Sequence, residues 1–173
     1  MDMPQGPDGL RLPRLVEGGY RIRIGADGTW YYQDSPIERM ALVKLFATVL
    51  RRDDEGGYWL QTPAERGRIV VDDAPFVAVG LAARGAGEEQ VLTLTTNLDD
   101  SVELGPDRPL WSEPGPDGEA PRPYILVRDR LPALVARSVY YELVSLAVER
   151  PAADGTIELG VWSNRTFFPL GAI

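Results

Sequence analysis

The chain has 173 residues, of which 44% are hydrophobic and 25% are charged, and its net charge is −8. This length suits one domain or two small ones, and the apolar content is enough to form a core. The acidic balance argues against a general nucleic-acid binder and against binding to anionic membranes, because both need a basic surface.

Residue types that carry much of enzyme chemistry are missing. The chain has no Cys, so it has no disulfide, thiol nucleophile or Cys-based zinc site. It has no His, which excludes a Ser-His-Asp triad and the commonest general base. Lys44 is the only lysine, so a GxxxxGK phosphate loop is impossible. Any remaining chemistry must therefore use carboxylates, Tyr, Ser/Thr or Arg. We assign no catalytic residue, no resident metal and no cofactor, and we expect a binding protein more than an enzyme.

Residues 1–18, "MDMPQGPDGLRLPRLVEG", predict a flexible tail, because they have neither the apolar core nor the basic start of a signal peptide. No stretch has about 18 consecutive apolar residues, as a membrane span would need. The expected location is the cytoplasm.

The next segments predict a hairpin followed by a helix. In "YRIRIGADGTWYY", two strand-forming runs flank "GADG", and Asp-Gly tolerates the positive φ of a tight turn. Ser35 and Pro36 are typical of a helix start and "DDEGG" of a helix end, so we expect a helix from Ser35 to about Arg52. Further strands are expected at "YWLQT", "GRIVV", "PFVAVGLAA" and "QVLTLTT".

The middle of the chain, residues 105–123, is dense in Pro, Gly and acidic residues. It predicts either a surface loop or a lid over a site. After a strand at "YILVR", a second helix is expected over "LPALVARSVYYELVSLAVER", with Pro132 in its first turn. The strands "TIELGVWS" and "TFFPLG" close the chain.

The two halves of the chain look alike. Shifted by 98 residues, the first helix lies on the second without a gap, and Arg39 meets Arg137. Both halves predict a strand, a helix opened by proline, a glycine turn and a strand. We therefore expect an α+β fold of two units related by internal duplication, at residues 19–82 and 88–173. Each unit is expected to be a mostly antiparallel sheet with one packed helix.

Arg39 and Arg137 are exceptions in the apolar pattern of the two helices. At about 100° per residue, each projects at the centre of the apolar side. The apolar side of the second helix is expected to comprise Tyr140, Tyr141, Val144 and Val148. Arg39 can run its stem along the core, pair with Asp72 or Asp73, or join Arg137 in holding an anion between the units. A guanidinium suits phosphate or carboxylate because it makes two parallel hydrogen bonds.

Polar residues near strand ends are further candidates. Thr62 and Glu65, in "TPAER", can contact a ligand or cap a turn. Asp72 and Asp73 can hold Mg²⁺ through a phosphate, or one of them can pair with an arginine. Arg128, at the end of "YILVR", is placed to join the two arginines.

Tryptophans on the predicted strands are more often core residues than ligand stackers. Trp30 and Trp162 are the two that could stack on a base. Trp162 is followed by Ser163 at a strand end, where a hydroxyl could donate a hydrogen bond to a ligand.

Several stretches together resemble the bacterial domain-of-unknown-function family 1285, from about Tyr20 to Leu170. The most specific are "SPIER", "LQTPAER" with "VDDAPF", and "GVWS". One departure is Arg165, where the resemblance implies a glycine. The resemblance implies a duplicated core, a second half like a pleckstrin-homology domain, and a binding site between the halves. It also implies a nucleotide-based ligand and a signalling role, but no established activity.

The function we predict is therefore non-catalytic binding of a small anionic, possibly nucleotide-like ligand in a regulatory role. One alternative is a protein-interaction module that binds a partner along a sheet edge. A weaker alternative is a metal-assisted phosphohydrolase that uses Asp72, Asp73 and Glu65.

Overall fold

The computed structural model describes residues 19–172, and the predicted N-terminal tail lies outside them. The chain forms two compact units. The first comprises the described residues up to Pro75 together with Asp129–Leu131, and the second comprises the remainder. The division follows Pro75, earlier than the gap expected between 82 and 88. No helix in the described part of the chain is long and apolar enough to cross a membrane.

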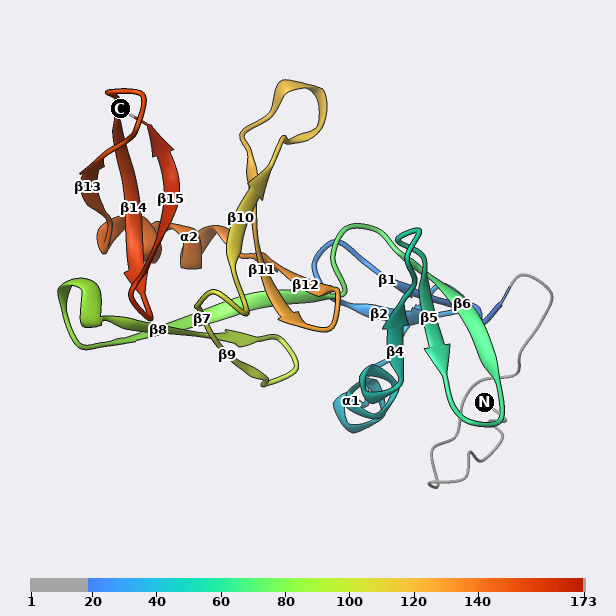
Figure 1. The fold of residues 1–173 in the computed structure, drawn as a ribbon. Helices are drawn as coiled ribbons and strands as arrows, with labels where there is room; N and C mark the ends of the chain where they lie inside the picture. The colour runs from blue at the N-terminus through green and yellow to red at the C-terminus, as the bar shows by residue number, and fades with distance from the viewer. Residues whose placement is uncertain (1–18, 173) are drawn as a thin grey trace. The chain divides into compact units, whose positions relative to one another are not determined.

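The first unit is a six-stranded mixed sheet with one helix (Figure 1). The strand order is β3-β2-β1-β6-β5-β4, in which β1 and β6 are parallel and the other neighbours are antiparallel. The elements are β1 (Ile22–Ile24), β2 (Trp30–Tyr32), β3 (Ser35–Pro36), α1 (Met40–Thr48), β4 (Leu50–Arg52), β5 (Tyr58–Gln61) and β6 (Arg66–Val71).

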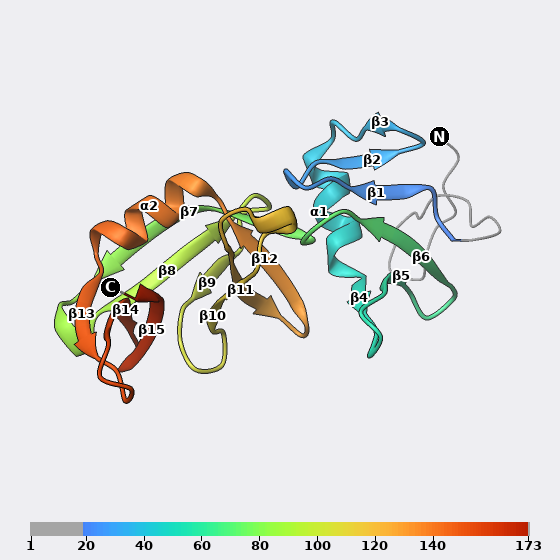
Figure 2. The ribbon, with the colours of Figure 1, turned by 90° about the horizontal axis from the view of Figure 1, so that it is seen from above.

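The second unit has a six-stranded sheet of order β10-β11-β12-β7-β8-β9 and a separate sheet of order β13-β14-β15. Figure 2 shows α2 beside β7. The elements are β7 (Phe76–Arg84), η1 (Gly87–Glu89), β8 (Val91–Thr96), β9 (Ser101–Glu103), β10 (Leu110–Glu113), η2 (Pro116–Gly118), β11 (Arg122–Arg128), β12 (Leu131–Val135), α2 (Arg137–Ser145), β13 (Val148–Pro151), β14 (Ile157–Ser163) and β15 (Thr166–Ala172).

The predicted α+β class is confirmed: two mixed six-stranded sheets each have a helix nearby, and strands predominate. The hairpin at "GADG" is also confirmed, since Ile22 pairs with Tyr32 and Gly28 takes a φ of 88°. The segment at 105–123 is not all loop, because β10 lies within it and pairs with β11.

Both helices are shorter than predicted. Ser35 and Pro36 form β3 by pairing with Tyr32 and Tyr31, so they do not open α1. After Thr48, the chain turns into β4, which pairs with β5. Pro132 lies in β12 and not in a helix turn. In each case strand pairing satisfies backbone groups that the sequence pattern assigned to a helix.

The inward projection predicted for Arg39 and Arg137 is wrong. Because both helices begin later than expected, Arg39 is the exposed N-cap residue of α1 and Arg137 is the exposed first residue of α2. The buried side of α2 is Val139 and Leu143. Three of the residues expected on the buried side are exposed, namely Tyr141, Val144 and Val148.

A local repeat is present, but the two units do not share one sheet order. Each helix is followed by an antiparallel meander, β4-β5-β6 after α1 and β13-β14-β15 after α2. The first turn of each meander has a glycine with a φ of 88°, Gly56 and Gly155. The first meander belongs to a six-stranded sheet, whereas the second is a separate sheet.

The core of the first unit lies between one face of the sheet and α1. Phe46 of α1 stacks on Trp30 of β2, with ring centroids 6.3 Å apart, and both are almost fully buried. Ile22, Ile24 and Leu60 are buried on the same side of the sheet. The alternate side chains, among them Arg23, Arg68 and Val70, lie on the other face of the sheet.

Ser163 joins the small sheet of the second unit to the six-stranded one. Its hydroxyl is fully buried, accepts a hydrogen bond from the Leu92 N–H at 2.9 Å and donates one to the Leu104 carbonyl at 2.6 Å. The Asn164 side chain also donates to the Leu104 carbonyl, at 2.9 Å. The hydroxyl therefore satisfies backbone groups at two other points in the chain.

Ser163→Ala is expected to lower the free energy of unfolding by about 1–3 kcal/mol, because it leaves the buried Leu92 N–H without a partner. Urea denaturation measures the change. Ser112→Ala, at an exposed position of β10, is the control and should stay within about 0.5 kcal/mol of the original protein. Equal small losses in both variants would contradict the structural role of the Ser163 hydroxyl.

Candidate functional site

A pocket lies at the start of α1, on the side of the sheet that the helix covers. Its volume is about 250 Å³. The lining residues are Tyr32, Ser35, Pro36, Ile37, Glu38, Arg39 and Leu42. They come from β2, from β3, from the link to the helix and from the first turn of α1.

The local chain path explains how these residues come together. Gln33 and Asp34 have φ values of 49° and 67°, which makes a two-residue turn that pairs Tyr32 with Ser35. The Ile37 N–H then donates to the Trp30 carbonyl at 2.8 Å. The link to α1 is therefore held against the end of β2, and the pocket forms beside it.

Arg39 gives the pocket its positive charge. Within residues 19–172, its side chain is exposed and makes no ion pair or hydrogen bond. No side chain caps α1 and no acidic residue lies in its first turn, so the free N–H groups of the helix start add to the positive potential. Glu38 also lines the pocket, and its negative charge reduces this positive potential. The arrangement suits an oxyanion that meets one guanidinium.

Thr62 stabilises a turn, and Glu65 forms a hydrogen bond with a buried tyrosine. The Thr62 hydroxyl accepts hydrogen bonds from the N–H groups of Ala64 and Glu65, which is the capping role. The Glu65 carboxylate accepts a hydrogen bond from the Tyr20 hydroxyl at 2.5 Å. Burial, together with this bond, raises the pKa of Tyr20 well above its usual range.

Asp72 pairs with Arg23 at 2.5 Å and not with Arg39, so that alternative for Arg39 is wrong. Asp73 is half-buried and is also engaged by other groups. No group of three or more Asp, Glu, His or Cys side chains converges as a metal site would anywhere in residues 19–172. The phosphohydrolase alternative therefore has no ligand cluster to support it in this part of the chain.

The remaining predicted residues are dispersed. Trp30 lies in the core of the first unit and has too little exposed surface to stack on a ligand. Ser163 is fully buried, with its hydroxyl bonded to the backbone. In the second unit, Arg128 lies over the Phe76 ring, and Trp162 packs edge-on against Phe167.

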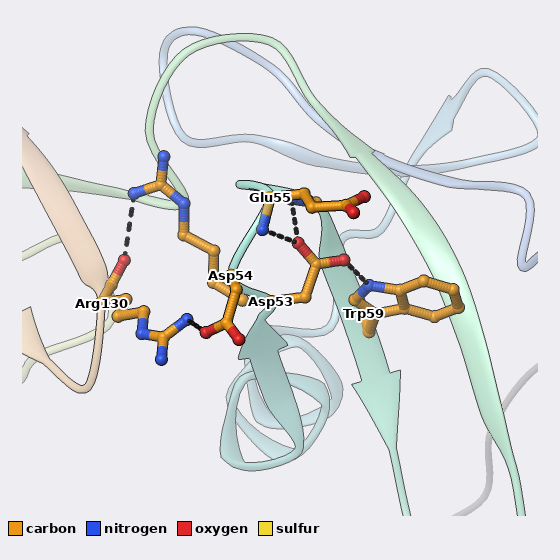
Figure 3. Close-up of polar contacts among 7 residues, drawn as sticks. Asp53, Asp54, Glu55, Trp59 and Arg130 are labelled. Carbon is orange, nitrogen blue, oxygen red and sulfur yellow. Dashed lines mark hydrogen bonds and ion pairs between the residues drawn. The ribbon is translucent and has the colours of Figure 1, made fainter.

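A second cluster surrounds Trp59 in the first unit. The Asp53 carboxylate accepts a hydrogen bond from the Trp59 indole N–H at 2.8 Å and others from the N–H groups of Glu55 and Gly57 (Figure 3). These bonds, that of Trp59 first, lower the pKa of Asp53 below its usual range. In the same unit, the neighbouring Asp54 pairs with Arg130 (Figure 3).

Sequence reasoning missed most of the pocket. The sequence pattern predicts a helix start at Ser35 and Pro36, and it does not mark the other lining residues as part of a site, namely Tyr32, Ile37, Glu38 and Leu42. Only the hairpin pairing of Ser35 with Tyr32 brings them together. A signal was available in "YYQDSP", since Asp before Ser-Pro is also typical of a turn.

Two family models match the chain. Residues 13–74 match the model described as "Domain of unknown function (DUF1285), N-terminal domain". Residues 75–170 match "Protein of unknown function (DUF1285), C-terminal domain". The boundary between the two models, after residue 74, lies one residue before the division of the structure after Pro75. No curated protein matches the chain.

Two crystal structures are similar to this chain. A DUF1285 family protein from Silicibacter pomeroyi DSS-3 is 39% identical, with a TM-score of 0.83 over 98% of this chain and 90% of that one. A DUF1285 family protein from Shewanella baltica OS155 is 25% identical, with a TM-score of 0.57 over 73% of this chain and 91% of that one.

The pKa of Asp53 is expected to rise toward its usual value in Trp59→Phe, because the ring is kept while the indole donor is lost. An NMR titration of the aspartate carboxyl groups measures this. A group with a lowered folded pKa adds stability above its unfolded pKa of about 3.9 and loses it as the pH falls through the folded value. The stability difference between the original protein and Asp53→Asn should therefore be flat above about pH 5 and shrink below pH 4. An Asp53 pKa that is unchanged by Trp59→Phe would contradict this account.

Proposed function

The chain belongs to the DUF1285 family, and from that premise we propose that it binds a small anionic ligand in the pocket at the start of α1. The role is regulatory and not catalytic. The observation that supports the proposal is Arg39, which lines a largely apolar pocket and whose guanidinium has no partner within residues 19–172. A guanidinium in such a setting favours a ligand with paired oxygens, such as a phosphate or a carboxylate.

The size of the pocket limits the ligand. Sites for drug-sized ligands usually have volumes of roughly 300–1,000 Å³, and this pocket has about 250 Å³. It therefore suits a phosphate or a short carboxylic acid, or the charged end of a larger molecule. A nucleotide-like ligand would place its phosphate beside Arg39 and leave its base outside the pocket.

Other parts of the hypothesis concern the second unit. Arg128, Arg137 and Trp162 remain predicted ligand contacts, and their joint use with Arg39 stays a prediction. The recurring helix-and-meander segment supports an origin by duplication. We also propose that the second unit is similar to a pleckstrin-homology domain.

Arg39→Met is expected to weaken binding of inorganic phosphate or pyrophosphate by about 1.5–3 kcal/mol, roughly tenfold to 150-fold, because a charged hydrogen bond is lost. Isothermal titration calorimetry measures this. The free energy of unfolding should change by no more than about 0.5 kcal/mol, because Arg39 is exposed and unpaired in the described structure.

Two further variants make the test specific to the pocket. Arg84→Met removes a charge from an exposed position of the second unit and should leave the affinity unchanged. Glu38→Gln removes the opposing carboxylate and should raise it. Phosphate that binds the original protein and Arg39→Met equally well would reject the pocket as the anion site.

A further inference from the structure

The face of the first sheet that points away from α1 carries a row of arginines and aromatic rings. Cross-strand partners share a face of a sheet. The register pairs Tyr31 with Arg23, Arg23 with Val70, and Trp59 with Arg68. Arg66 lies two residues before Arg68 on β6. We call the six residues Arg23, Tyr31, Trp59, Arg66, Arg68 and Val70 the arginine face.

The arginine face is open within the described part of the first unit. The alternate residues Ile22, Ile24, Leu60 and Ile69 are buried, on the side where α1 packs. Val70, in contrast, is 57% exposed, and the side chain of Arg68 is 52% exposed. A partner that covers Val70 would gain free energy by removing its apolar surface from water.

The guanidinium groups are held in place before any partner arrives. That of Arg23 lies 4.4 Å from the centre of the Tyr31 ring, and those of Arg66 and Arg68 lie 3.8 and 5.1 Å from the centre of the Trp59 indole. An arginine stacked in this way loses less side-chain entropy on binding and keeps edge donors for paired oxygens.

The charge balance favours a partner with few, spaced negative charges over a nucleic acid. Arg23 is paired with Asp72, and the Arg68 guanidinium lies 3.7 Å from the Asp53 carboxylate. These carboxylates neutralise part of the positive charge of the arginine face. Arg66 has no acidic partner within residues 19–172. The two arginines on Trp59 leave less of the indole free to stack on a base.

We propose that the arginine face is a docking surface for an extended acidic segment of a partner protein. Arg66, Arg68 and Val70 alternate along β6, so their side chains repeat every two residues, about 6.6–6.8 Å apart. Alternate side chains of an extended peptide have the same spacing. The segment that fits carries two acidic side chains, two residues apart, followed two residues later by an aliphatic one. This surface does not involve Arg39 or the pocket.

The probe is a fluorescein-labelled peptide that contains the pattern Glu-Thr-Glu-Thr-Val, and fluorescence anisotropy with the full chain measures its binding. The double variant Arg66→Gln with Arg68→Gln is expected to weaken binding at least tenfold. The control, Arg84→Gln with Arg165→Gln, removes two exposed charges that pair with Glu103 and Glu89 in the second unit. It should stay within twofold. A peptide with Gln in place of Glu should not bind.

Val70→Glu tests the aliphatic contact and is available if the double variant does not fold, because Val70 is exposed. It should also weaken binding at least tenfold. The proposal is overturned if the original chain does not bind the peptide at 1 mM. It also fails if face and control variants weaken binding equally, or if oligo(dT) of the same length binds more tightly than the peptide.

Discussion

The packing of Phe46 against Trp30 is the contact on which the first unit depends. It places α1 on one face of the sheet, and the buried aliphatic residues of β1, β5 and β6 follow on that face. Because strand side chains alternate, the opposite face then carries Arg23, Arg66 and Arg68. The same contact brings the start of α1 beside the β2–β3 hairpin, where the pocket forms. One packing interaction thus sets both surfaces for which we propose functions.

This packing leaves the Trp30 indole N–H buried and without a hydrogen-bond partner among the described residues. An unpaired buried donor costs about 1–3 kcal/mol. The stacking and burial of the Trp30 and Phe46 rings offset this cost, since a buried aromatic side chain removes about 150–250 Å² of surface from water. In the second unit, by contrast, the buried Ser163 hydroxyl has hydrogen-bond partners, because it accepts from one backbone N–H and donates to one carbonyl.

The two proposed surfaces differ in the chemistry they offer. The pocket is small and has one arginine in its lining, near the start of a helix, so in our proposal it takes a single oxyanion. The arginine face is a sheet surface with stacked guanidinium groups and an exposed valine, so in our proposal it takes a repeated pattern along an extended chain. The two proposals therefore concern separate surfaces of one unit.

The sequence by itself determined the α+β class, the hairpin at "GADG", most strands and the family, because alternation and turn residues act locally. It also marked Arg165, which takes a φ of 61° in the final turn where the resemblance implies glycine. Only the tertiary structure decided where the helices begin, since Ser35 and Pro132 are equally compatible with a helix start and with strand pairing. It likewise decided that Arg39 is exposed and that Ser163 is buried. Partners for backbone and side-chain groups come from distant parts of the chain, and no local pattern specifies them.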